Sequence, residues 1–267
     1  MKPRSLVFDL YGDYLRYLGG EAPLRVVVDL LAEFGIPEAT ARVMMTRLKK
    51  EGWLDTRRDG RSTVYALNDR SWQLLDEGRR RIFHREPGAW DRQWRMAIYR
   101  VPESDRSARE RVRKSLRWLG FGMLAPATWI SPHDRLGEVA RALQQETSVR
   151  LDLLTARSHG AAADLDMARR CWDLEDQHKN LLKKRESYRA LLARYRAAPP
   201  VGAGALRERT ELVHDYRLTL FDDPDLPPEL APQDWVGREV HDLFTEAHDL
   251  LRAEAEAHCR LVADTAR

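Results

Sequence analysis

Side chains that can bind phosphate or base edges share one face of a helix expected between about residues 37 and 51. Arginine can pair with guanine edges or with phosphate, threonine can bond either or touch a thymine methyl, and lysine neutralises phosphate. This pattern indicates contact with DNA, and its alternative is an ordinary solvated helix face. The residues on this face are Thr40, Arg42, Val43, Thr46, Arg47 and Lys50.

A basic hairpin follows this helix directly. Residues 53–58 and 61–67 read as two strands, with Asp59 and Gly60 expected to form the turn between them. Arg57, Arg58 and Arg61 flank that turn, whereas a generic hairpin has no need of three arginines around its tip. The hairpin therefore favours DNA binding over the solvated-surface interpretation.

Two further helices must hold the basic helix in place. They are expected over residues 5–18 and 24–34, and Gly35 ends the second before the turn to the basic helix. Helix, short turn, helix and hairpin together predict a winged helix-turn-helix. The residues expected to face inward are Leu6, Leu10, Tyr14, Tyr17 or Leu18, Val27, Leu30, Leu31, Ala41, Met44 and Leu48.

The composition predicts a soluble protein of several domains. The chain has 267 residues, of which 43% are hydrophobic and 33% charged, with a net charge of +3. No apolar run has the length of a membrane span, and the first residues lack the pattern of a signal peptide, so we expect no membrane association and a cytoplasmic location. Cys171 and Cys259 stand outside any zinc-ligand spacing and are expected to be reduced.

The middle of the chain predicts a strand–helix–strand–strand–helix–strand order, the ferredoxin-like arrangement. Ser104 is the expected N-cap of its first helix. A helical C-terminal part follows, with a flexible connector expected near Gly202. The expected middle elements cover residues 94–99, 105–119, 121–124, 128–130, 134–145 and 149–155, and the expected C-terminal helices cover 164–198, 206–221 and 235–262.

The fold class is thus α+β and multidomain. Its three expected domains are a winged helix-turn-helix over residues 1–87, a ferredoxin-like domain over 88–160 and an all-α domain over 161–267.

Three stretches of the sequence resemble the phenylacetic-acid-degradation repressor family, the PaaX-like regulators. They cover residues 47–67, residues 116–129 with the run LRWLGFG, and residues 212–235 with LVHDYR followed by LPPEL. The resemblance implies a homodimeric DNA-binding repressor whose ferredoxin-like middle domain is similar to Cas2. It also implies release by an aryl acyl-CoA, phenylacetyl-CoA in the founding members. On DNA, such a dimer is expected to bind an operator of two half-sites.

Six residues are candidates for binding that effector. His214, Tyr216 and Arg217 could meet the phosphates and adenine of an acyl-CoA. Trp129, Trp172 and Tyr188 could line an aryl pocket, although packing in a core is the alternative for each aromatic ring.

Two other kinds of chemistry are alternatives. A Cas2-like fold suggests a metal-dependent nuclease as an alternative function. However, Tyr99 and Arg100 stand where such enzymes have an Asp, and arginine cannot bind Mg²⁺. Asp105 is a nearby carboxylate. His241 and His248 lie seven residues apart, whereas helical metal pairs are usually three or four apart. We therefore expect no enzyme, no catalytic residue, no metal and no cofactor. A regulator without a small-molecule effector is the remaining alternative.

Overall fold

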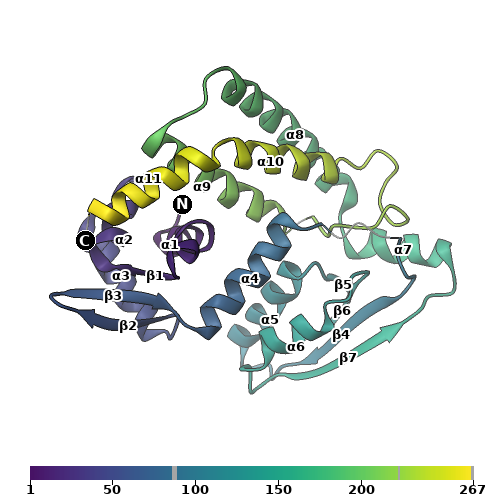
Figure 1. Ribbon diagram of the computed structural model, residues 1–267. Coiled ribbons are helices and arrows are strands. Elements are labelled where there is room, and N and C mark those ends of the chain that lie inside the picture. The colour runs from purple at the N-terminus through teal and green to yellow at the C-terminus, as the bar shows by residue number, and fades with distance from the viewer. Residues whose placement is uncertain (86–88, 222, 266–267) are drawn as a thin grey trace. The chain divides into compact units, whose positions relative to one another are not determined.

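The computed structural model describes residues 1–85, 89–221 and 223–265, and it divides into two compact units (Figure 1). Unit 1 comprises residues 1–84, 186–217 and 241–267, and unit 2 comprises residues 85–185 and 218–240. The expected boundary between residues 87 and 88 lies outside the described residues. The division into three domains stays a prediction.

The N-terminal part of unit 1 contains helices and a small antiparallel sheet with the strand order β1-β3-β2. The short strand β1 has no counterpart in the expected elements. The elements are α1 (Pro3–Asp13), the 3₁₀ helix η1 (Leu15–Leu18), β1 (Glu21–Pro23), α2 (Leu24–Ala32), α3 (Glu38–Lys50), β2 (Leu54–Asp59), β3 (Ser62–Leu67) and α4 (Asp69–Phe83).

Two details of the N-terminal helices differ from expectation. The first helix ends at Asp13 and continues only as η1, so that Tyr17 is 56% exposed while Leu18 packs against the core. In α3 the buried stripe is Ala41, Met45 and Leu48 rather than one through Met44, which is only partly buried. Both sets have helical spacing, so packing against the core of unit 1 selects Met45. The expected inward residues of α2 are buried.

The core of unit 1 joins segments that are far apart in the sequence. Leu206, Ala255 and Cys259 are at most 1% exposed and belong to the same apolar cluster as the side chains of α1, α2 and α3. They lie on α9 (Gly202–Thr219) and α11 (Arg252–Thr265), and α10 (Gly237–Leu250) precedes α11. The N-terminal module therefore shares its core with the C-terminal helices of unit 1.

The C-terminal helices are more interrupted than the sequence pattern predicted. The helix expected over residues 164–198 is two helices, α7 (Ala161–Cys171) and α8 (Leu174–Ala197), because Trp172 adopts an extended backbone conformation. The helix expected over residues 235–262 is likewise divided at Leu251 into α10 and α11. Gly202, expected in a flexible connector, begins α9.

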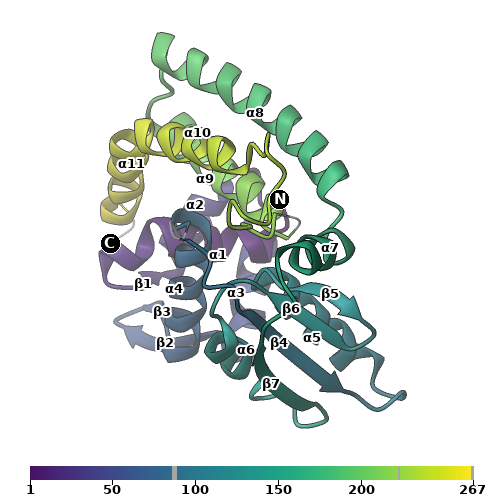
Figure 2. The same ribbon diagram turned by 90° about the vertical axis from the view of Figure 1, so that its right-hand side faces the viewer.

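Unit 2 contains a four-stranded sheet in the order β5-β6-β4-β7, in which all neighbouring strands are antiparallel (Figure 2). Helices α5 and α6 pack on one face of the sheet, and α7 with residues 226–231 packs on the other. Asp105, rather than Ser104, caps α5 by accepting a hydrogen bond from the Ala108 amide at 2.9 Å. The elements are β4 (Trp94–Arg100), α5 (Arg106–Trp118), β5 (Gly122–Ala125), β6 (Thr128–Ser131), α6 (Leu136–Leu143) and β7 (Arg150–Ala156).

Candidate nucleic-acid interface

Helix α3 exposes one face and buries the other. Ala41, Met45 and Leu48 hold it in the core of unit 1, and this fixes which residues can reach a ligand. Val43 lies on the outward face and is 69% exposed. The six α3 residues expected to contact DNA are all exposed: Thr40, Arg42, Val43, Thr46, Arg47 and Lys50.

The hairpin of β2 and β3 carries the second set of candidate contacts. Asp59 pairs with Ser62, so the turn is made by Gly60 and Arg61 rather than by Asp59 and Gly60. Gly60 has φ of 55°, a left-handed conformation that favours glycine. This register places Arg61 at the tip of the hairpin, with Arg58 exposed on the strand beside it.

Three of the candidate cations are free to bind an anion. Among the described residues, the side chains of Lys50, Arg58 and Arg61 form no hydrogen bond and no ion pair. All three are exposed, so neutralising a phosphate would not require any of them to leave a protein partner. Lys49 is also exposed and has no partner among the described residues, but it was not among the candidates. Its position next to the candidate Lys50 could have identified it.

The other three cations are paired with carboxylates at the surface. Arg42 pairs with Glu38 at 2.7 Å, Arg47 pairs with Glu51 at 2.7 Å, and Arg57 pairs with Glu21 of β1 at 2.5 Å.

Exposed ion pairs of this kind stabilise a fold by only about 0–1 kcal/mol. A phosphate or a base edge can therefore compete for these arginines. Hydrogen bonds from Arg4 and then Arg47 lower the pKa of Glu51, so this carboxylate is ionised at neutral pH.

The candidate effector residues lie in both units. In unit 2, Trp129 and Trp172 belong to different apolar clusters, and Trp172 stacks with Trp94 at a centroid distance of 6.3 Å. In unit 1, the hydroxyl of Tyr188 donates to Asp215 at 2.8 Å, and Tyr216 stacks on Phe244 at 4.1 Å. These contacts are those of packed core side chains, and the role of the four aromatic residues in effector binding stays a prediction.

His214 and Arg217 both face a carboxylate of α1. The Nδ1 atom of His214 lies 3.2 Å from Asp9 Oδ2, and Arg217 lies 3.5 Å from Asp9 Oδ1. Their role in effector binding also stays a prediction.

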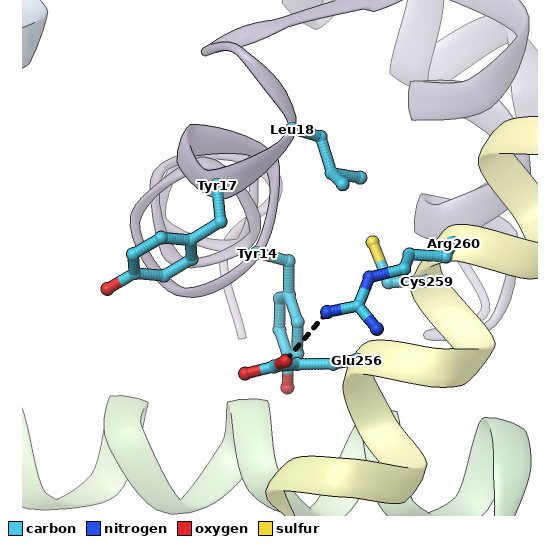
Figure 3. A pocket seen from close by; sticks show the side chains of 6 residues that line it. All are labelled: Tyr14, Tyr17, Leu18, Glu256, Cys259 and Arg260. Atoms are coloured by element: carbon cyan, nitrogen blue, oxygen red, sulfur yellow. Dashed lines mark hydrogen bonds and ion pairs between the residues drawn. The ribbon is translucent and has the colours of Figure 1, made fainter.

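A small pocket between η1 and α11 is lined by none of the six candidates (Figure 3). Arg260 donates there to Glu256 at 3.0 Å. The residues that line this pocket are Tyr14, Tyr17, Leu18, Glu256, Cys259 and Arg260.

The residues considered for metal chemistry have other contacts. Asp105 accepts hydrogen bonds from Ala108, Ser107 and Ser148, and these bonds lower its pKa. Across residues 1–85, 89–221 and 223–265 no three His, Cys, Asp or Glu residues are grouped so that they could hold a metal ion. The same residues include no helix long and apolar enough to cross a membrane.

Comparisons with known proteins show the family of the chain. Three family models match: PaaX-like protein over residues 2–71, the PaaX protein central Cas2-like domain over 87–168, and the PaaX-like protein C-terminal domain over 172–261. Transcriptional repressor PaaX of Escherichia coli (strain K12) is 33% identical over 246 residues, which cover 90% of this chain and 77% of the relative. The solved structure of the uncharacterized protein Rv0674 from Mycobacterium tuberculosis matches with a TM-score of 0.50 and 28% identity, covering 89% of this chain and 91% of that one. The chain described here has a mixed α+β architecture with a Cas2-like central domain and a helical C-terminal region, and it belongs to the PaaX-like family.

Proposed function

We propose that this chain is a transcriptional repressor that binds double-stranded DNA through a winged helix-turn-helix. In this proposal α3 is the recognition helix and the β2–β3 hairpin is the wing. The observation that carries it is that Lys50 on the exposed face of α3 and Arg58 and Arg61 at the end of the hairpin are exposed and have no partner among the described residues. The relative named as a transcriptional repressor supports it. Such a protein acts in the cytoplasm, where its DNA lies, and it is not an enzyme.

The proposal extends to the assembly and its control. A homodimer binds two half-sites, and an aryl acyl-CoA such as phenylacetyl-CoA favours a dimer geometry that no longer matches them. The Cas2-like domain has the ferredoxin-like arrangement in this proposal, supported by its strand order β5-β6-β4-β7 with antiparallel neighbours. The effector's influence is limited by the ratio of its affinities for the two geometries.

A mobility-shift titration tests the proposal. The probe is the DNA upstream of the protein's own gene, compared with a random duplex of the same length. The wild-type chain should bind the upstream DNA more tightly, and saturating phenylacetyl-CoA should release it. Equal affinity for both duplexes refutes the proposed function as a repressor. Retention at saturating phenylacetyl-CoA refutes that effector and leaves a repressor without one, or with another.

Two substitutions separate base reading from phosphate binding. Arg47→Ala should cost about 1–3 kcal/mol at one base pair, and Lys50→Ala should weaken all sequences and lower the salt slope by about one. Lys179→Ala is the matched control, because it removes an exposed cation of unit 2 whose ion-pair partners among the described residues, Glu175 and Asp176, lie on its own helix. Unchanged binding by the Arg47 and Lys50 variants on every duplex would refute this orientation of α3.

A further inference from the structure

Three carboxylates of the N-terminal module are each held by one arginine and one histidine from the C-terminal helices of unit 1. Asp9 and Asp13 lie on α1, and Glu33 ends α2. The six basic partners come from α9, α10 and α11. They are His214 and Arg217 for Asp9, Arg209 and His248 for Asp13, and Arg207 and His258 for Glu33.

The Asp13 cluster is the most buried of the three. Arg209 lies 2.7 Å from Asp13, and the Nε2 atom of His248 lies 3.0 Å from it, with all three side chains at most 6% exposed. Arg209 also donates to the carbonyl of His248 at 3.1 Å, which ties α9 to α10. Burial alone would raise the pKa of Asp13, but His248 and Arg209 hold it below its usual range. The carboxylate is therefore ionised inside the protein.

The Glu33 cluster lies at the turn that leads into α3. His258 is 3.2 Å and Arg207 is 3.6 Å from the Glu33 carboxylate. Glu33 is followed by a tight turn, in which the amide of Ile36 donates to the carbonyl of Leu31 at 3.2 Å, and α3 begins at Glu38. A contact at Glu33 therefore restrains the point from which α3 departs.

We propose that Asp9, Asp13 and Glu33 are positioning residues of the DNA-binding surface, through which α9, α10 and α11 fix the orientation of α1, α2 and α3. The inference rests on the proposed function, because it assigns these carboxylates an indirect role in DNA binding. They would act by orienting α3 and not by touching the DNA. It also gives the C-terminal helices a route to α3: a shift of α9 or α11 changes the partners of Glu33 and Asp9.

The sign of the effect separates this role from simple electrostatics. DNA is a polyanion, so removing a carboxylate from a module that binds it should tighten binding if only charge matters. If the carboxylate positions α3, the same substitution should weaken binding. Glu33→Gln is the main variant because this side chain is 27% exposed and its loss leaves the apolar core in place. Asp9→Asn is the second variant.

The experiment measures the affinity of full-length variants for the upstream duplex at low salt and well below the unfolding temperature, after circular dichroism has shown that they are folded. Glu33→Gln and Asp9→Asn should bind on the order of three- to tenfold more weakly than the wild type. The matched control is Asp29→Asn, which removes a carboxylate of α2 that is half-buried like Glu33 and whose partner, Arg25, lies on the same helix. It should bind as tightly as the wild type or slightly more tightly. Equal or tighter binding by Glu33→Gln and Asp9→Asn overturns the inference.

Hydrogen exchange of the DNA-free proteins keeps this inference distinct from the proposed function. The amides of residues 38–50 should exchange faster in Glu33→Gln than in Asp29→Asn. If the wild type showed no preference for the upstream duplex, the proposed function would fail, and exchange would still decide the inference. Exchange of α3 at the wild-type rate in Glu33→Gln overturns it.

Discussion

Replacing Asp13 by asparagine should be among the most destabilising single changes of a polar residue in unit 1. The side chain is isosteric, so packing is kept and only the negative charge is lost. Arg209 and the ring of His248 are both 3% exposed and would remain buried beside a neutral amide. Removing one partner of a buried ion pair costs about 3–5 kcal/mol, because the remaining charge has neither water nor a counter-ion.

The assay is thermal unfolding followed by circular dichroism at neutral pH. At about 2–4 °C per kcal/mol for a chain of this size, the expected fall in Tm is roughly 6–20 °C. Asp29→Asn is the control, since its partner Arg25 is 62% exposed and such a surface pair contributes at most about 1 kcal/mol.

A double variant tests the assignment of cause. Adding Arg209→Met to Asp13→Asn removes the unpaired charge. The loss of stability in the double variant should therefore be smaller than the sum of the losses in the two single variants by at least about 1 kcal/mol. A Tm for Asp13→Asn within a degree of the control, or strict additivity in the double variant, would show that the buried cluster does not stabilise unit 1 as argued.

Three further predictions concern stability and reactivity. The pKa of folded Asp13 lies below its unfolded value of about 4, so the stabilisation by its carboxylate is complete above that pH and is lost as the pH falls through the folded pKa. In acid the Tm of Asp13→Asn should therefore fall less steeply than that of the wild type. Parallel curves of Tm against pH for the two proteins would contradict this. Gly122→Ala would place a Cβ 2.6 Å from Trp172 Cε2 and 2.7 Å from Cys171 Cβ, so it should destabilise unit 2 by about 1–3 kcal/mol in urea unfolding, and an unchanged midpoint would refute this packing. Burial raises the pKa of the Cys259 thiol to about 12, and the residue is 1% exposed, so DTNB at pH 8 should label it only after denaturation; rapid labelling of the native protein at Cys259 would count against the shared core.

Helical periodicity was enough to find most elements of the fold, because each amphipathic stretch buries one face. It failed by one residue in α3, where Met44 and Met45 are equally apolar and only packing against α1 and α2 selects Met45. The break at Leu251 carries no glycine or proline, so no local signal marked it. The strand β1 is three residues long and exists because it pairs with β3, which a reading of its own sequence could not show.

The exposure of the candidate DNA-contacting residues was predictable for a physical reason. Exposed arginines and lysines on a helix and a hairpin tip are local features, visible in the sequence by type and spacing. The pairs of Asp9, Asp13 and Glu33 with the C-terminal helices join residues about 170 to 240 positions apart. Nothing in the neighbouring sequence of either partner marks such a contact, so these clusters required the structure.

The shared core of unit 1 has a consequence for how the chain is made. Residues 1–84 leave the ribosome well before residues 252–265, yet Ala255 and Cys259 complete the apolar cluster that contains Leu6 and Leu30. The growing chain therefore exposes an unfinished apolar surface for most of its synthesis, where a chaperone could bind it. A product ended by a premature stop before α11 should therefore be degraded or aggregate, and should not persist as a folded N-terminal module.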